Sequence, residues 1–216
     1  MSDSRDPLRL MAVTAHPDDE SLGMGGTLAR YAAEGVETYL VAATRGERGR
    51  FYSPERKPGP DVVGRVREDE LRAAARELGM REVRFLDYVD GELDRADPAE
   101  AIARIVGHLR RVRPQVVVTF DPFGAYGHPD HIAICQFTTA AVVAAAEPGF
   151  RVRDTAAPEW GPAPDATLRA ARGEPDDGSA ERVERAGRTA SRAGHDAPHA
   201  VAKLYYMAWD PDTWAA

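Results

Sequence analysis

The stretch that decides the fold is Leu8–Glu20, LRLMAVTAHPDDE, near the start of the 216-residue chain. Residues 8–14 are mostly apolar, which is typical of a parallel strand buried on both faces. A helical pattern follows at 20–34, and Gly35 stands where helices commonly end. In an α/β sheet, such a strand-to-helix turn lies at the carboxyl end of the strand, where ligands bind. The polar residues of this turn are therefore candidates for a functional site.

The alternation of strands and helices continues along the chain. Strands are expected at 36–44, 82–86 and 115–120, helices at 62–78, 99–113 and 132–146, and a last core strand at 201–209. Asp97 followed by Pro98 is good chemistry for the start of the third helix. The pattern predicts an α/β fold, a Rossmann-like three-layer sandwich with a mostly parallel sheet and an active site at the carboxyl ends of the strands.

Composition and charge exclude several classes of protein. A net charge of −7 and a pI of about 5.4 argue against a general nucleic-acid surface. No apolar run approaches the roughly 20 residues of a membrane span, and residues 1–7 lack the apolar core of a signal peptide. We therefore expect a cytoplasmic protein without a membrane span. The single cysteine, Cys135, excludes an internal disulfide and is expected to be a small buried apolar residue.

The length suits one domain, which we expect to span residues 1–216. Residues 147–200 differ from the rest because they contain few large apolar side chains. They are expected to form a variable segment, either a flexible insert or an exposed loop with a short helix near 180–193. The long loop at 45–61 carries Arg48 and Arg50 and is expected to shape substrate choice. The pocket cover is expected to be missing, truncated or supplied by a neighbouring copy, and homo-oligomerisation is left open.

A second polar stretch, Asp121–His131 (DPFGAYGHPDH), follows the fourth expected strand and leads into a helix. It therefore occupies a position equivalent to that of the first stretch. Together the two stretches hold three of the six histidines. We expect the side chains of the other three histidines, His108, His195 and His199, to be solvated.

The spacing of histidines and carboxylates in the two stretches indicates a divalent metal site. His16 and Asp19 lie three residues apart, as do His128 and His131, so each pair can face one ion from the first turn of a helix. One set of three ligands would be His16, Asp19 and one of the two later histidines. Such a set suits zinc, leaves iron(II) open, and disfavours calcium.

The two stretches also supply groups for acid–base chemistry: Asp18, Asp130, Tyr126 and whichever of His128 and His131 does not bind the metal. Alternatively, Asp18 or Asp19 could simply cap the helix. The presence of two His-Pro-Asp clusters at equivalent strand ends favours a functional site over a simple helix cap.

Ala15–Glu20 and Tyr126–His131 resemble the two motifs of the PIG-L (LmbE-like) zinc-dependent N-deacetylases. Thr44–Gly49, Arg67–Glu70 and Asp90-Gly91 resemble further family features. The resemblance covers roughly residues 8–146 and resumes at 203–206.

The resemblance implies a zinc ion held by His16, Asp19 and His131. It implies that Asp18 is the general base acting on water. His128 would be the protonated partner that stabilises the oxyanion or serves as general acid.

The resemblance also implies supporting roles. Asp130 would hydrogen-bond His128 and hold its charge and orientation. Tyr126 resembles the tyrosine that polarises the amide carbonyl in mycothiol-pathway members. Arg67 and Asp90 match positions that bind the sugar in those members.

The leading hypothesis is a metal-dependent hydrolase that removes an N-acyl group, most simply N-acetyl, from an amino sugar or an N-acetylglucosamine-containing conjugate. One alternative is an amidase or deacylase that acts on a thiol-sugar conjugate or a natural product. A non-enzyme alternative is a catalytically inactive metal-binding module. A dinucleotide-binding protein is disfavoured because His-Pro-Asp-Asp-Glu occupies the turn that would need the Gly-rich fingerprint.

Overall fold

The computed structural model of the chain describes residues 6–49, 58–152 and 197–208. In chain order, its elements are β1 (Arg9–Thr14), α1 (Asp19–Ala33), β2 (Glu37–Thr44), α2 (Pro60–Glu77), β3 (Glu82–Tyr88), the 3-10 turn η2 (Leu93–Arg95), α3 (Pro98–Val112), β4 (Val116–Phe120), α4 (Gly124–Gly127), α5 (Pro129–Ala146) and β5 (Lys203–Met207).

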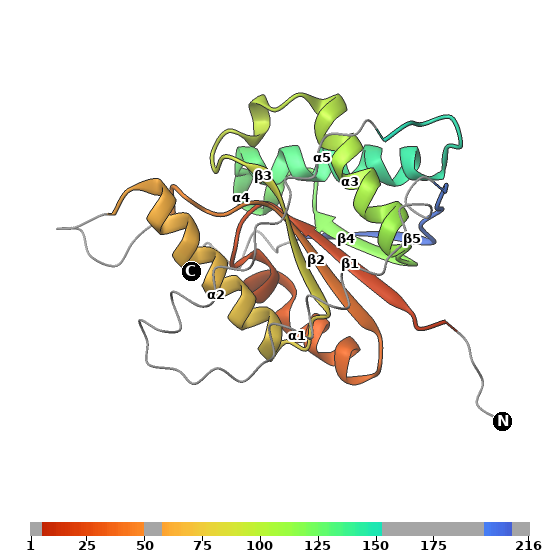
Figure 1. Cartoon of the computed structure of the whole chain (residues 1–216), viewed down its shortest axis with the longest axis horizontal. Coiled ribbons are helices and arrows are strands. Elements are labelled where there is room, and N and C mark those ends of the chain that lie inside the picture. The colour runs from red at the N-terminus through yellow and green to blue at the C-terminus, as the bar shows by residue number, and fades with distance from the viewer. Residues whose placement is uncertain (1–5, 50–57, 153–196, 209–216) are drawn as a thin grey trace, which may run out of the picture.

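The described strands form one five-stranded sheet in the order β3-β2-β1-β4-β5, and every neighbouring pair is parallel. Helices α1 and α2 cover one face, and α3 and α5 cover the other (Figure 1). The predicted α/β sandwich with a parallel sheet is therefore confirmed.

Two apolar cores form because alternate residues of a strand point to opposite faces. Leu10 and Ala12 of β1 pack toward the side that includes Leu28 of α1. Met11 and Val13 pack toward the side that includes Ile105 of α3. Burial of both strand faces explains why β1 reads as a nearly continuous apolar run.

The order of the strands creates a crevice at the carboxyl end of β1. From β1 the chain runs outward through β2 and β3, and it then returns to place β4 on the other side of β1. Such a reversal is the point where open α/β sheets bind ligands. Ala12 pairs with Val118, so β1 and β4 end at a similar level. The loops after these two strands therefore meet across the crevice.

Three sequence-based expectations are corrected at the level of the elements. Helix α5 begins at Pro129 rather than at residue 132, so Asp130 and His131 belong to its first turn. Strand β3 continues to Tyr88. Within the described residues β5 is an edge strand rather than a core strand, and its Tyr205 is 50% exposed.

The structure also places single residues that the sequence left uncertain. Cys135 is buried and has no disulfide, as predicted. The expectation of solvated histidines is wrong for His199, which is 8% exposed and contacts the Pro114 carbonyl oxygen through Nε2 at 2.7 Å. His108 is half-buried with its Nδ1 shielded from solvent, and burial and the nearby Arg111 and Arg84 lower its pKa to about 3. His195, Arg50 and the helix expected near 180–193 lie outside the described residues.

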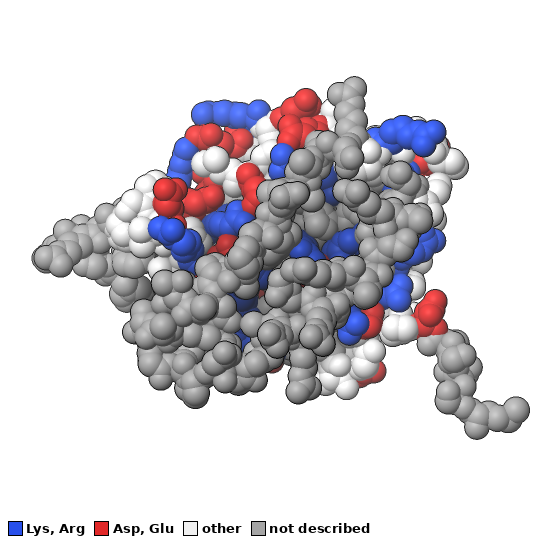
Figure 2. Space-filling view, viewed as in Figure 1, with Lys and Arg blue, Asp and Glu red and all other residues white. Residues whose placement is uncertain are grey.

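Basic and acidic side chains are interspersed among the coloured atoms of Figure 2. None of the helices in the described part of the chain is long and apolar enough to cross a membrane.

Candidate active site

The turn after β1 is built around the side chain of Asp19. Its Oδ2 accepts hydrogen bonds from the backbone N–H groups of Ala15 at 3.1 Å and His16 at 2.8 Å. These bonds fold the chain back on itself between the strand and α1. The buried carboxylate and the His16 ring thereby come to the same side of the turn, as the three-residue spacing predicted.

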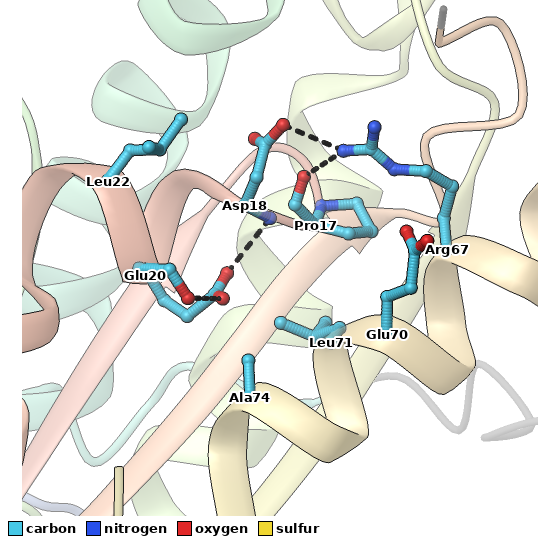
Figure 3. Close-up of a pocket in the computed structure, with 9 residues that line it drawn as sticks. Pro17, Asp18, Glu20, Leu22, Arg67, Glu70, Leu71 and Ala74 are labelled. Carbon is cyan, nitrogen blue, oxygen red and sulfur yellow. Dashed lines mark hydrogen bonds and ion pairs between the residues drawn. The ribbon is translucent and has the colours of Figure 1, made fainter. Parts of the chain in front are cut away.

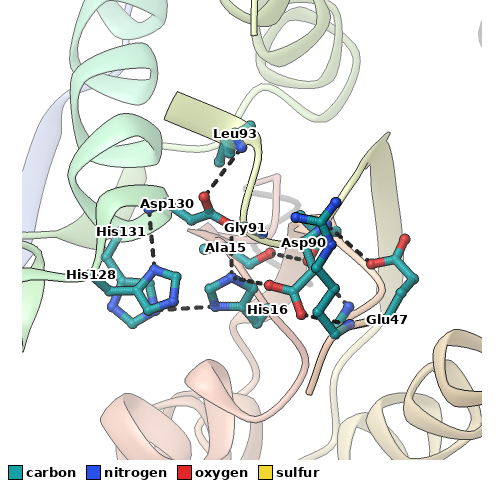
Figure 4. Close-up of polar contacts among 12 residues, drawn as sticks. Ala15, His16, Glu47, Asp90, Gly91, Leu93, His128, Asp130 and His131 are labelled. Atoms are coloured by element: carbon teal, nitrogen blue, oxygen red, sulfur yellow. Dashed lines mark hydrogen bonds and ion pairs between the residues drawn. The ribbon is translucent and has the colours of Figure 1, made fainter. Parts of the chain in front are cut away.

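The loop after β4 brings two histidines to the same place. His128 is the N-cap of α5, where its Nδ1 accepts from the backbone N–H of Asp130 at 3.2 Å. His131, in the first turn, is 2% exposed, and its ring stacks on Phe120 with centroids 3.8 Å apart. The helix start and the stacking fix the direction in which both rings point (Figure 4).

Three side chains present ligand atoms to one point between the two loops. Nδ1 of His16 lies 3.2 Å from Nε2 of His131 and 3.8 Å from Oδ2 of Asp19. Nε2 of His131 lies 3.4 Å from Oδ1 of Asp19. A tetrahedral ion with bonds of about 2.0–2.2 Å separates its ligand atoms by roughly 3.3–3.6 Å. The distance from His131 to Asp19 lies in this range, whereas the distance from His16 to Asp19 is longer and is measured to the other carboxylate oxygen. Ligation of a metal by His16, Asp19 and His131 therefore stays a prediction.

His128 also lies within reach of this point. Ligand nitrogens of His16, His128 and His131 all lie within 4.8 Å of one another. The geometry therefore brings both histidines of the second stretch to the site. Asp19 distinguishes the His16 and His131 pair, because it contacts both of their rings.

The far side of the His16 ring is held by two carboxylates. Its Nε2 lies 3.0 Å from Oδ2 of Asp130 and 3.2 Å from Oδ1 of Asp90. A carboxylate accepts only, so Nε2 donates, and in the neutral ring the lone pair of Nδ1 faces Asp19 and His131. Burial alone would lower the pKa of His16, but Asp130, Asp90 and Asp19 raise it to about 10. These surroundings favour positive charge and suit a bound cation.

The carboxylate of Asp130 differs from the expectation. It was expected to hydrogen-bond the ring of His128, but it accepts from His16 and from the backbone N–H groups of Gly91 at 2.7 Å and Leu93 at 3.2 Å. The loop after β3 supplies these two N–H groups and draws the carboxylate toward β1. Desolvation raises the pKa of Asp130, but these partners lower it overall.

The charge expected on His128 also differs. Desolvation lowers its pKa, and the nearby His16 and His131 lower it further, against the opposing effect of Asp130. The surroundings of His128 therefore favour its neutral form, whereas the resemblance implied a protonated ring.

Asp18 is placed apart from the three ligands. Its side chain is 50% exposed, and its Oδ2 contacts Nη2 of Arg67 at 2.8 Å. The same guanidinium group donates to the Pro17 carbonyl oxygen. Gly46, with φ +67°, permits this approach, since a Cβ there would lie 3.3 Å from Nε of Arg67 and 3.2 Å from Cδ of Pro17.

A cleft of about 230 Å³ opens beside Asp18 between α1 and α2. Figure 3 shows Asp18 and Arg67 at one end, with Glu70 on the α2 wall and Leu22 on the α1 side. The expected sugar-binding residue Arg67 thus lies in an accessible cleft next to Asp18. The contact of Arg67 with a sugar stays a prediction.

The other two predicted residues lie beside different histidines, Tyr126 beside His131 and Asp90 beside His16. Tyr126 is 62% exposed, and its ring centroid lies 5.4 Å from that of His131 in an edge-on arrangement. Desolvation and the negative charges of Asp19, Asp18 and Asp90 raise its pKa, which keeps the hydroxyl protonated. Asp90 is 8% exposed and contacts His16, and its sugar-binding role stays a prediction.

The sequence reasoning missed the residues that support these side chains. Glu47 accepts from the backbone N–H of Asp90 at 3.3 Å, and the backbone N–H of Arg48 donates to the Asp90 carboxylate at 3.0 Å. Glu20 is 1% exposed and accepts from the backbone N–H of Asp18 at 3.1 Å. The only signal for Glu20 was its place in the quoted stretch. Backbone donors such as Arg48 carry no signal in a single sequence.

The fold and the site define a doubly wound α/β protein with a candidate metal centre at its topological switch point. The profile of the PIG-L family, described as GlcNAc-PI de-N-acetylase, matches residues 11–142. This match covers more than half of the chain, and the chain therefore belongs to the PIG-L family.

Three relatives show the range of similarity. The 1D-myo-inositol 2-acetamido-2-deoxy-alpha-D-glucopyranoside deacetylase of Kineococcus radiotolerans is 42% identical over an alignment of 178 residues that covers 70% of this chain and 49% of that protein. The N,N'-diacetylchitobiose deacetylase of Pyrococcus horikoshii has a TM-score of 0.61 at 29% identity, over 67% of this chain and 53% of that one. The 4-carboxy-2-hydroxymuconate hydratase GalB of Pseudomonas putida KT2440 has a TM-score of 0.58 at 29% identity, over 66% and 59%.

These comparisons also show a difference in length. The matched region spans about half the length of the Kineococcus deacetylase. The comparison with GalB shows that a similar fold also occurs in a protein named as a hydratase.

Proposed function

We propose that the chain is a metal-dependent N-deacetylase that acts on an N-acetylglucosamine-containing sugar, with an N-acetylglucosaminyl-inositol as the leading candidate. The observation that carries the proposal is the close approach of His16, Asp19 and His131, with the accessible carboxylate of the adjoining residue Asp18 at the edge of a cleft. The sugar class is supported by the deacetylase relative at 42% identity.

His16, Asp19 and His131 would hold the ion, and we propose zinc, with iron(II) as the alternative for the same two imidazoles and carboxylate. When bound, such an ion lowers the pKa of water and polarises the amide carbonyl. Asp130 and Asp90 would orient His16 from the far side of its ring.

The other side chains would perform the proton transfers. Asp18, at the edge of the cleft, would take a proton from the attacking water. Tyr126 would donate a hydrogen bond to the amide oxygen as negative charge develops there. His128, whose ring centroid lies 4.8 Å from that of His131, would start neutral, take up the proton that Asp18 has removed from water, and pass it to the leaving nitrogen. The products are the free amino sugar and acetate.

Substrate contacts would be made from the cleft beside Asp18. Arg67 points into that cleft and would hydrogen-bond hydroxyl groups of the sugar or of its inositol. Asp90 is a weaker candidate for the sugar because its carboxylate already contacts His16.

The test is an assay for free amine with N-acetylglucosamine, N-acetylglucosaminyl-inositol, diacetylchitobiose and an N-acyl thiol-sugar conjugate, each with zinc, with iron(II) and with a chelator. We expect amine release from the inositol conjugate that is lost with the chelator and restored by metal. Release only from the thiol-sugar conjugate would shift the function to the amidase alternative.

The similarity to GalB gives a further control. Hydration of 4-carboxy-2-hydroxymuconate by the chain is measured in parallel with the release of amine from the sugars. Hydration without release of amine from any sugar would overturn the deacetylase assignment.

A further inference from the structure

Three consecutive carboxylates, Asp18, Asp19 and Glu20, have very different surroundings. The side chain of Asp18 is 50% exposed, whereas Asp19 is 8% exposed and Glu20 is 1% exposed. The Asp19 carboxylate accepts from the backbone N–H groups of Ala15 and His16, and Asp19 is a proposed metal ligand. Glu20 lies on the other side of the turn, and the proton transfers described above make no use of it.

The side chain of Glu20 is fully engaged at the start of α1. Its Oε2 accepts from the backbone N–H of Asp18 at 3.1 Å, and its Oε1 accepts from the hydroxyl group of Ser21 at 2.5 Å. Figure 3 shows the carboxylate of Glu20 under the backbone of Asp18, whose own carboxylate points the opposite way, to Arg67. The first turn of the helix leaves such N–H groups without an internal partner.

The backbone of Asp18 needs this support. Its φ of 100° and ψ of −28° lie in the left-handed region, which is unfavourable for a residue with a Cβ. Such a conformation persists only where neighbouring contacts hold it. The carbonyl oxygen of Asp18 accepts from the N–H groups of Ser21 and Leu22, and its N–H is held by Glu20. Contacts on both sides of the residue therefore set the direction of its side chain.

We propose that Glu20 is a positioning residue that holds Asp18 in its left-handed conformation and thereby aims the Asp18 carboxylate at the cleft. This inference rests on the proposed role of Asp18 as the base. Glu20 acts through the peptide N–H of Asp18, and its side chain also forms part of the wall of the cleft.

The first experiment compares Glu20→Met with Glu20→Gln. Both side chains match glutamate closely in length, but only glutamine offers an oxygen to the Asp18 N–H. With N-acetylglucosaminyl-inositol as substrate, we expect kcat of Glu20→Met to fall about 10- to 100-fold, with KM and bound zinc unchanged. Glu20→Gln is expected to restore most of the kcat. Glu34→Met, the same change at the exposed end of α1, controls for the chemistry of the substitution.

The second experiment repeats Glu20→Met in an Asp18→Asn background. If Glu20 acts through Asp18, the substitution causes no further loss of kcat there. An equal loss in both backgrounds would overturn the proposal, because Glu20 would then act independently of Asp18. Loss of bound zinc in Glu20→Met would overturn it as well, since the effect would pass through Asp19.

A third measurement depends neither on activity nor on the folding of a variant. Amide hydrogen exchange, read residue by residue by NMR, is expected to show protection of the Asp18 N–H in the unsubstituted protein. Exchange at the rate of an unprotected amide would overturn the proposal. If Asp18 is protected but Asp18→Asn retains full turnover, the geometry stands, and the proposed function of Asp18 is what fails.

Discussion

The two ends of the parallel strands, which we call the amino edge and the carboxyl edge of the sheet, differ in how their charged side chains are paired. At the carboxyl edge Asp19, Asp90 and Asp130 contact His16, and Asp18 instead contacts Arg67. At the amino edge Glu37 and Glu82 each have two guanidinium partners. Glu37 contacts Arg9 and Arg81, and Glu82 contacts Arg84 and Arg111.

This difference distinguishes a candidate metal site from ion pairs that stabilise the fold. At the amino edge burial raises the pKa of Glu37 and Glu82, but the Tyr39 hydroxyl and the arginines lower it overall for Glu37, and the arginines lower it overall for Glu82. At the carboxyl edge the same kind of side chain is arranged around imidazole nitrogens, and the pKa of His16 rises to about 10. An uncompensated cluster of carboxylates and histidines attracts a cation, whereas a compensated one stabilises the fold.

The strongest test of the difference is Asp18→Asn at the carboxyl edge. We expect turnover of N-acetylglucosaminyl-inositol to fall about 10²- to 10⁴-fold, since the general base is lost. Bound zinc, measured by mass spectrometry of the purified protein, is expected to stay at the level of the unsubstituted chain. Turnover within a few-fold of that chain would remove Asp18 from its proposed role.

Asp19→Asn tests the charge of the metal site itself. The amide oxygen can still accept from the N–H groups of Ala15 and His16, but the negative charge is lost. We expect zinc affinity, measured by competition with a chromogenic chelator, to fall by more than the about 10- to 100-fold typical of losing an outer partner. Glu82→Gln at the amino edge is the control, and an equal loss of affinity in both variants would contradict the distinction between the edges.

His108 tests the amino side of the molecule through pH. Its pKa of about 3 in the folded chain lies below the usual 6.5, so the unfolded chain binds the additional proton. The free energy of unfolding therefore falls as pH is lowered from 6.5 toward 3, by up to about 1.4 kcal/mol per pH unit. His108→Gln is expected to remove this slope in urea titrations between pH 6.5 and 5. An unchanged slope would show that His108 is not held neutral.

Glu82→Gln is expected to give the smallest effect. The Glu82 side chain is 25% exposed, so loss of its charged contacts with Arg84 and Arg111 costs about 1 kcal/mol of the free energy of unfolding. Turnover is expected to stay within about twofold, which is the range of a surface substitution remote from the site. The measurements are a urea melt and the amine-release assay. A larger effect on turnover than on stability would link the amino edge to the site.

Much of the fold was predictable because it depends on local patterns. The apolar run of β1, Gly35 after α1 and Asp97-Pro98 before α3 are signals that act within a few residues. The structure confirms them, and the Asp97 side chain accepts from the Ala99 N–H at 2.8 Å. The edge position of β5 was not predictable, because the sequence of a strand does not state which neighbours it will have.

The candidate site was predictable in its members but not in all its contacts. The equal spacing in His16-Asp19 and His128-His131 indicated a shared ion, and the structure places the His131 ring within 3.4 Å of both His16 and Asp19. The partner of Asp130 was predicted wrongly, because proximity in sequence favours His128. The carboxylate turns to His16 instead, where the N–H groups of Gly91 and Leu93 also reach it.

By itself, the sequence determined the order of strands and helices, the strand-end position of both His-Pro-Asp stretches and the types of side chain available for chemistry. Only the tertiary structure decided which atoms face one another. It placed Asp130 against His16, left Asp18 at the cleft and buried Glu20 and His199. The physical reason is that periodicity and turns arise from interactions over a few residues, whereas the partner of a buried polar group is set by backbone groups brought from distant strands.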